Sequence, residues 1–328
     1  MFSIHARPGW YLPERKATPE SLYRNRRAFL RELGFAGMGL AGLAGIRNAN
    51  AQDAAAVPQA VADIPLPEFK RNPAFADAGR PITDQKYPEN FNNFYEFGFT
   101  KELPAQRSQG FNLDPYTIEI DGLVEKPLKL DIEQIEKLGV EERVYRFRCV
   151  EAWSMTVPWI GVPLHKVLKQ VEIKPEAKFV AFTTFHDPEK AFGQREKVYD
   201  WPYKEGLRLD EAMNELTMAV TGLYGKRLLP QNGTPLRIIT PWKYGYKGPK
   251  SIVKISLVAE QPPTLWSTAI PEEYKLYSNV DPDVPHPRWS QASEKQLGDV
   301  IVRAETQWYN GYGEYVANLY KDMPRTLY

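Results

Sequence analysis

The sequence contains a single cysteine, Cys149, among its 328 residues. This scarcity excludes an internal disulfide, a Cys-x-x-Cys metal site and a Cys-x-x-Cys-His haem attachment. Cys149 then has three ordinary uses: an inert core thiol, a nucleophile, or the one thiolate ligand of a metal whose other ligands come from elsewhere. Arg146 and Arg148 stand close before it and favour the thiolate that the last two uses require. Its position alone leaves the inert thiol equally open.

Other chemistry-bearing patterns are missing as well. The four histidines, His5, His165, His186 and His286, are widely spaced, which excludes a His-x-x-x-His zinc site. The sequence has no Gly-x-Gly-x-x-Gly fingerprint, no Walker loop and no Gly-x-Ser-x-Gly elbow, which disfavours nicotinamide, nucleotide and serine-hydrolase chemistry. It also has no ligand set for a haem or an iron–sulfur cluster. A redox enzyme built on this chain therefore needs a separate protein as electron donor.

The N-terminal region carries an export pattern. Residues 25–31 read Asn-Arg-Arg-Ala-Phe-Leu-Arg, an apolar glycine-rich stretch follows at 33–46, and Ala-Asn-Ala occupies 49–51. This pattern resembles a twin-arginine signal peptide, so we expect residues 1–51 to be removed after passage through the twin-arginine translocon to the periplasm. Because that route carries folded proteins, it suits a cofactor inserted in the cytoplasm. The alternatives are an amphipathic helix, which the glycines disfavour, and a membrane anchor, for which the stretch is too short.

The predicted mature chain, residues 52–328, is mildly acidic. The first 51 residues hold eight Lys and Arg and three Asp and Glu, so without them the formal charge of +1 becomes −4. Nucleic-acid binding needs a basic face, so we expect no nucleic-acid partner. No later segment approaches the ~20 apolar residues of a membrane span, and we expect the mature protein to be soluble.

The pattern of apolar residues predicts an α+β fold with mixed sheets, short helices and long loops. Residues 52–80 are rich in Ala and Pro and read as an extended tether, which leaves residues 81–328 as a single catalytic domain. Strands are predicted at 116–122, 144–149, 178–185, 235–240 and 251–258, and helices at 131–138, 163–171 and 209–216.

Two glycine-containing segments favour binding of an anion. Residues 231–237 contain Asn232, Gly233 and Arg237, and residues 243–250 end in Gly248, Pro249 and Lys250. Glycine allows close approach of the backbone, arginine offers a planar fork, and lysine offers a point charge. The alternative is a pair of ordinary turns with solvated lysines.

The run Arg-Cys-Val-Glu-Ala-Trp-Ser-Met-x-Val-Pro-Trp-Ile-Gly-x-Pro-Leu at 148–164 resembles the molybdenum-ligand segment of the bacterial periplasmic protein-methionine-sulfoxide reductases. Those enzymes have a catalytic subunit of the sulfite-oxidase fold that carries a molybdenum–molybdopterin cofactor. The resemblance extends over 92–96, 207–212, 230–250 and 286–292, and so over nearly the whole predicted mature chain.

The resemblance implies a role for individual residues. Cys149 matches the one protein ligand of molybdenum, with one molybdenum per chain. The residues that match contacts to the cofactor are Asn92, Tyr95, Glu96, Thr184, Asn232, Arg237, Gly248, Pro249 and Lys250. The family usually has another residue at the position of Pro249, and proline lacks the N–H that a contact there would use. Glu151 is a candidate catalytic proton relay, and its alternative is a structural or surface carboxylate.

The resemblance also implies an activity and partners. We expect reductive oxygen-atom transfer from methionine sulfoxide in exported proteins, with electrons from a membrane-bound haem-b subunit that draws on quinone. The chain ends without the extra domain that dimerises sulfite oxidases, so a monomer is expected. Two alternatives stay open: an enzyme for small S- or N-oxides or sulfite on the same cofactor, and an exported binding protein with an inert Cys149. Glu151 disfavours sulfite, because a carboxylate repels a dianion.

Overall fold

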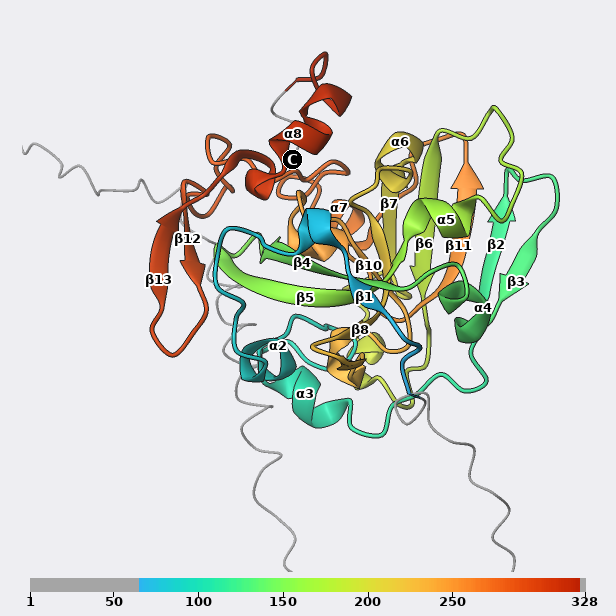
Figure 1. Cartoon of the computed structure of the whole chain (residues 1–328), viewed down its shortest axis with the longest axis horizontal. Helices are drawn as coiled ribbons and strands as arrows, with labels where there is room; N and C mark the ends of the chain where they lie inside the picture. The colour runs from blue at the N-terminus through green and yellow to red at the C-terminus, as the bar shows by residue number, and fades with distance from the viewer. Residues whose placement is uncertain (1–64, 325–328) are drawn as a thin grey trace, which may run out of the picture. The chain divides into compact units, whose positions relative to one another are not determined.

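The computed structural model describes residues 65–324 (Figure 1). The predicted signal at 1–51 and the tether residues 52–64 lie outside the described residues. Every α-helix described has four or five residues: α2 (Lys86–Asn90), α3 (Leu103–Arg107), α4 (Ile132–Glu136), α5 (Leu164–Leu168), α6 (Leu209–Ala212), α7 (Leu265–Ala269) and α8 (Gly313–Val316). None of the helices in residues 65–324 is long and apolar enough to cross a bilayer. Two sheets with these short helices around them confirm the α+β class.

The larger sheet is built on an antiparallel hairpin that carries the lone cysteine at its bend. Its strands β4 (Glu141–Arg148) and β5 (Trp153–Pro163) pair from Glu141↔Gly161 to Arg148↔Ser154. The other strands of this sheet are β1 (Lys70–Arg71), β8 (Met218–Leu223), β9 (Lys226–Arg227), β10 (Arg237–Ile239), β12 (Ser293–Gln296) and β13 (Val302–Glu305). Neighbours on both edges bury β5 along its whole length, as its apolar sequence requires.

The smaller sheet has the order β3-β2-β11-β6-β7 and lies to the right in Figure 1. Its strands are β2 (Ile118–Gly122), β3 (Leu128–Leu130), β6 (Phe179–Thr184), β7 (Lys204–Arg208) and β11 (Ile252–Val258). Strand β11 runs parallel to β2 and antiparallel to β6, so the sheet is mixed. Alternation in β2 buries Ile118 and Ile120 and leaves Glu119 partly exposed, which is the period-2 pattern of a strand with one covered face.

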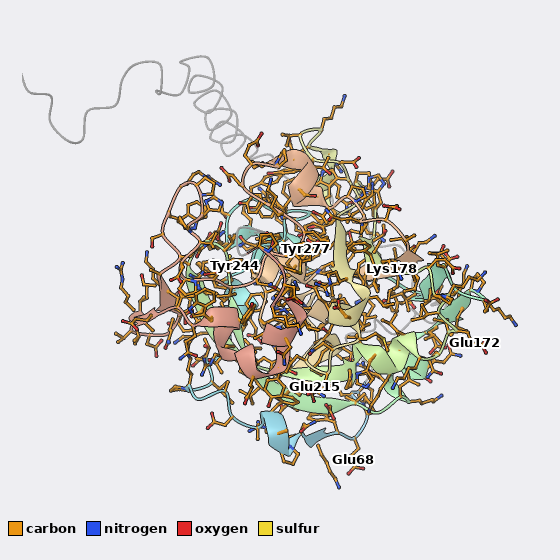
Figure 2. The ribbon with its side chains drawn as sticks, turned by 90° about the horizontal axis from the view of Figure 1, so that it is seen from above. Glu68, Glu172, Lys178, Glu215, Tyr244 and Tyr277 are labelled. Atoms are coloured by element: carbon orange, nitrogen blue, oxygen red, sulfur yellow. The ribbon has the colours of Figure 1, made fainter. Side chains whose placement is uncertain are left out.

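A shared apolar layer joins the two sheets. Ile120 and Ile255 of the smaller sheet belong to the same buried cluster as Val162 and Ile238 of the larger one. A second cluster, rich in aromatic residues, surrounds Cys149. Figure 2 shows Tyr244 of this cluster toward the interior of the described part, while Glu68 projects at its edge.

The N-terminal part of the described chain lies along the larger sheet. Strand β1 pairs with β4, and Phe75 is buried in the aromatic cluster. Arg80 forms an ion pair with the buried Glu294 of β12. Residues 65–80 are therefore attached to the larger sheet at these three points, although most of them are exposed or only partly buried.

Candidate active site

Cys149 lies in the tight bend between β4 and β5. The bend is closed by hydrogen bonds from the Cys149 amide to the Trp153 carbonyl at 2.9 Å and from the Ala152 amide to the Cys149 carbonyl at 3.0 Å. Ala152 adopts a φ of +67°, which lets the chain reverse within a few residues. The hairpin thus holds the thiol on a rigid element rather than on a free loop.

Burial controls the protonation of this thiol. The Cys149 side chain is 5% exposed, and burial raises its pKa to about 12, an effect to which the nearby Glu151 carboxylate adds. Arg148 is fully buried and is directed to Glu294, Gln291 and the Cys149 carbonyl. Arg148 favours the thiolate, as expected, but desolvation outweighs its attraction in the protein alone. A metal ion is the partner that holds such a buried sulfur as a thiolate.

A deep cleft opens beside Cys149, with about 960 Å³ of empty space when the solvent at its mouth is included. Its wall brings together eight of the residues predicted from the sequence: Asn92, Tyr95, Glu96, Cys149, Glu151, Asn232, Arg237 and Lys250.

Among residues 65–324, two cations face the cleft without forming an ion pair, although Glu96 attracts one of them, Lys250. Arg237 is 3% exposed, donates to the Asn232 carbonyl at 3.0 Å, and leaves its Nε without a hydrogen bond. Lys250 Nζ donates only to carbonyl oxygens, those of Asn93 at 3.0 Å and Gln231 at 2.8 Å. Burial lowers the pKa of Arg237 to about 9, and burial with repulsion from Arg237 lowers the pKa of Lys250. Two buried cations of this kind are suited to bind an anionic group of a molecule in the cleft.

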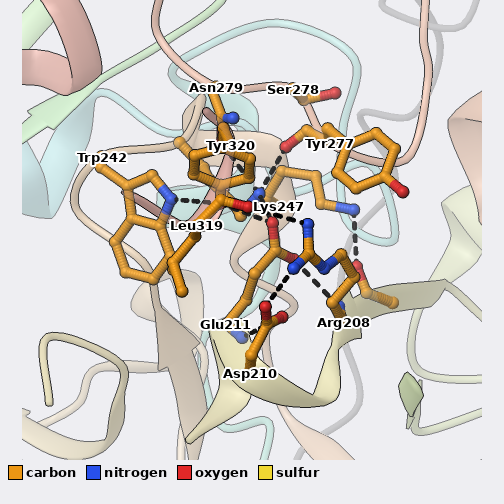
Figure 3. A network of polar contacts seen from close by, with 12 residues as sticks. Arg208, Asp210, Glu211, Trp242, Lys247, Tyr277, Ser278, Asn279, Leu319 and Tyr320 are labelled. Carbon is orange, nitrogen blue, oxygen red and sulfur yellow. Dashed lines mark hydrogen bonds and ion pairs between the residues drawn. The ribbon is translucent and has the colours of Figure 1, made fainter. Parts of the chain in front are cut away.

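The neighbouring lysines are engaged elsewhere, which corrects the alternative of solvated lysines. Lys243 and Lys247 are buried and form ion pairs with Glu211 and Glu205. Figure 3 shows Glu211 in this network, where it also accepts a hydrogen bond from Tyr320 Oη at 2.5 Å. Lys250 alone of these three lysines lines the cleft.

A polar cluster stands at the sulfur. Asn93 Nδ2 lies 3.5 Å from Cys149 Sγ and 3.2 Å from Glu151 Oε2, and Lys101 Nζ lies 2.6 Å from the same carboxylate oxygen. Trp153 Nε1 donates to it as well, at 3.0 Å. Burial alone would raise the pKa of Glu151, but the ion pair with Lys101 and the hydrogen bonds outweigh burial and hold the pKa below its usual value. Glu151 is thus a charged, fixed carboxylate and not a loose surface group.

Comparison with known proteins places the chain in a family. Residues 104–266 match the model of the oxidoreductase molybdopterin binding domain. The protein-methionine-sulfoxide reductase catalytic subunit MsrP of Burkholderia mallei (strain ATCC 23344) is 45% identical over 322 residues, which cover 97% of this chain and 95% of that protein. The chain belongs to this family of molybdopterin enzymes. A solved structure, the sulfane dehydrogenase SoxCD from Paracoccus pantotrophus, aligns with a TM-score of 0.42 and 15% identity over 69% of this chain and 64% of that one.

Membership of a molybdopterin family explains the combination seen in the cleft. The cofactor of such an enzyme carries a metal and a phosphate, and the cleft offers one sulfur, that of Cys149, and two buried cations, Arg237 and Lys250. The Asn232 side chain adds a buried Oδ1 without a partner, and its Nδ2 donates to the Pro88 carbonyl at 2.7 Å. Glu96 is also buried, which raises its pKa to about 7. The residues present therefore fit the group that the family carries.

Three predicted cofactor contacts do not line the cleft of this family member. Thr184 ends β6, pairs with Ile252, and directs its hydroxyl to the Phe185 carbonyl at 3.5 Å. A Cβ at Gly248 would lie 2.6 Å from the Ile238 carbonyl oxygen, so the glycine serves close packing. The Pro249 carbonyl accepts from the Ile238 amide at 3.1 Å. Gly248 and Pro249 thus hold the segment that ends in Lys250, and their direct contact with the cofactor stays a prediction.

Much of the aromatic wall of the cleft has no signal in the sequence. The rings of Tyr95 and Trp266 lie 5.1 Å apart, and Trp266 and Tyr274 are separated by the same distance. Burial raises the pKa of Tyr274 to about 12, so its hydroxyl is neutral. Trp153 and Trp159 belong to the buried aromatic cluster and also line the cleft, whereas Trp242 is fully buried and donates from Nε1 to Tyr320 Oη. No local pattern around Trp266 or Tyr274 marks them, because long-range folding brings them to the site.

Proposed function

We propose that this chain reduces methionine sulfoxide residues of exported proteins to methionine, as the catalytic subunit of a repair system. The observation that carries the proposal is the cleft in which a buried thiol, Cys149, stands with two buried cations, Arg237 and Lys250. The 45% identity to a protein named as a methionine-sulfoxide reductase supports the substrate class. When bound, molybdenum–molybdopterin supplies an acceptor for the substrate oxygen and a store for two electrons.

The residues of the cleft divide the work of holding the cofactor. Cys149 would provide the sulfur ligand, and its thiol would lose its proton on binding the metal. Arg237 and Lys250 would neutralise the phosphate. The remaining predicted contacts to the organic part of the cofactor are Asn92, Tyr95, Glu96, Thr184, Asn232, Gly248 and Pro249, of which Thr184, Gly248 and Pro249 would act from behind the wall of the cleft.

The open side of the cleft suits an uncharged sulfoxide better than an oxyanion. The aromatic rings of Tyr95, Trp266 and Tyr274 offer an apolar surface for the methyl and methylene groups beside the sulfur. The Glu151 carboxylate would repel sulfite. Because Lys101 and Trp153 hold Glu151 Oε2 in place close to Cys149 Sγ, this oxygen is the atom that would pass protons to the departing oxygen of the substrate.

The partners follow from what the chain offers. Electrons would come from a membrane-bound haem-b subunit that oxidises quinone, since the sequence offers no ligand set for a haem or cluster of its own. The paired arginines at 26 and 27 support export through the twin-arginine translocon to the periplasm, where methionine is oxidised. Outside the complex with its donor the protein would be a monomer.

Elemental analysis together with turnover tests this function. Protein purified from a molybdate-supplied host should contain about one molybdenum per chain and, with a reduced dye as donor, should reduce an oxidised unfolded protein. Cys149→Ser should fold normally by circular dichroism and lose more than about 99% of turnover, because the metal would lose its thiolate ligand. Unchanged kinetics in this variant would disprove the ligand assignment. Turnover of free sulfoxides alone would favour a small-molecule enzyme, and stable wild-type protein without metal would favour a binding protein.

A further inference from the structure

Two side chains form hydrogen bonds with the peptide unit between Val150 and Glu151. The Val150 carbonyl oxygen accepts one hydrogen bond from Trp289 Nε1 and one from Gln291 Nε2, both at 2.8 Å. Gln291 is fully buried and Trp289 is half-buried. Both side chains come from the segment before β12, about 140 residues further along the chain. Two strong donors on one carbonyl fix the orientation of its peptide plane.

The same peptide unit donates to the sulfur of Cys149. The Glu151 amide nitrogen lies 3.4 Å from Cys149 Sγ, within hydrogen-bonding distance of a sulfur acceptor. In a planar trans peptide the C=O of Val150 and the N–H of Glu151 point in opposite directions. The two donors that hold the carbonyl on one side therefore aim the N–H at the sulfur on the other.

The two donors are themselves fixed. The Trp289 ring stacks on His286 with centroids 3.8 Å apart and an interplanar angle of 7°. His286 Nε2 lies 3.3 Å from Glu273 Oε2, which also binds Arg288 at 2.7 Å. Gln291 Oε1 accepts from the buried Arg148 at 2.9 Å, so its amide cannot turn without loss of that bond. The whole arrangement forms a rigid support behind the metal-ligand position.

We infer that Trp289 and Gln291 are positioning residues that tune the metal through the Cys149 sulfur. An N–H···S hydrogen bond withdraws electron density from a thiolate ligand, stabilises the reduced metal and raises its reduction potential. The inference rests on the proposed function in one respect, the attachment of the cofactor to Cys149. It assigns a task to the 286–292 segment, which the site does not otherwise use.

Substitutions that remove each donor test the inference. Trp289→Phe keeps the ring on His286 and loses the N–H, and Gln291→Met keeps the side-chain length and loses the amide. In molybdenum-loaded protein, a redox titration monitored by electron paramagnetic resonance should give a lower midpoint potential in each single variant and the lowest in the double variant. In 15N-glutamate-labelled metal-free protein, the Glu151 amide proton signal should move upfield as its bond to sulfur weakens.

Two control variants separate this effect from general loosening. Trp201→Phe removes a similar indole bond, from Nε1 to the Glu196 carbonyl at 3.1 Å, away from the cleft. Thr306→Val removes another acceptor of Arg148, at 3.3 Å, and leaves Val150 untouched. Both controls should keep the wild-type potential and the wild-type Glu151 amide signal.

The outcomes also distinguish this inference from the proposed function. An unchanged potential in the loaded double variant, together with an unchanged amide signal in its metal-free form, would overturn the inference alone, and so would an equal shift in the two controls. Lowered potential in an enzyme that reduces no sulfoxide would support the inference and overturn the proposed substrate. Wild-type protein without molybdenum would overturn the attachment to Cys149 and with it the inference.

Discussion

Some residues of the cleft carry a charge that does not stabilise the fold. Arg237 is buried with one hydrogen bond to a carbonyl and ring contacts to Trp159 and Phe147, but no carboxylate neutralises it. Lys247, only ten residues away, is equally buried and is paired with Glu205. A buried charge without a counter-ion destabilises a protein, so its removal can be stabilising. Removal of one member of a buried ion pair is destabilising, because the other charge stays buried and uncompensated. The two positions should therefore respond in opposite ways to the same substitution.

Arg237→Met and Lys247→Met make this contrast measurable. Arg237→Met should leave the metal-free protein as stable as wild type or more stable by about 1–2 kcal/mol, because it removes an uncompensated buried charge. It should also lower the content of molybdenum and pterin at least tenfold. Lys247→Met should destabilise the protein by about 3–5 kcal/mol, because Glu205 stays buried alone. Urea unfolding and elemental analysis give both quantities. Destabilisation of equal size in both variants would mean that Arg237 is a structural residue.

At the scale of elements, the sequence predicts strands better than it predicts helices or pairings. The strands predicted at 116–122 and 251–258 are confirmed as β2 and β11, and the helix predicted at 131–138 begins as α4 with a capping box between Asp131 and Gln134. The predicted helix at 163–171 ends at Leu168, because the amides of Gln170 and Val171 bond three residues back instead of four, and the chain then turns so that the Lys174 amide donates to the Leu123 carbonyl. The parallel pairing of β12 with β5 at Trp153, which brings 286–292 behind Cys149, has no local pattern because it depends on long-range packing.

Truncation tests where the folded domain begins. A chain that starts at residue 65 should be as stable as one that starts at residue 52. A chain that starts at residue 84 should lose more than about 3 kcal/mol, because it loses the burial of Phe75, the pairing of β1 with β4 and the ion pair of Arg80 with Glu294. Urea unfolding of the three proteins gives the difference. Equal stability of all three would support the predicted domain boundary at residue 81.

At the scale of the whole molecule, the family and the class of fold could be predicted from the sequence, and most of the cleft followed from them. Cys149, Arg237 and Lys250 stand in long motifs, so their roles could be predicted without coordinates. Lys101 could not be found in this way, because its pairing with Glu151 depends on the fold and not on spacing. The protonation of Cys149 was also beyond the sequence, since it depends on how deeply the thiol is buried.

The predicted export of the whole molecule depends on its N-terminal signal, which lies outside the described residues. Arg26→Lys with Arg27→Lys keeps the charge of the signal but removes the two guanidinium forks that a receptor reads. We expect the precursor of this variant to stay in the cytoplasm, folded and loaded with molybdenum, while the wild type reaches the periplasm in shortened form.

The matched control, Arg7→Lys with Arg15→Lys, changes two arginines outside the motif and should be exported normally. Cell fractionation with elemental analysis of each fraction decides the outcome. Normal export of the Arg26 and Arg27 variant would contradict the twin-arginine route. Cytoplasmic precursor without metal would contradict loading before export, since the cofactor would then have to enter the cleft after translocation.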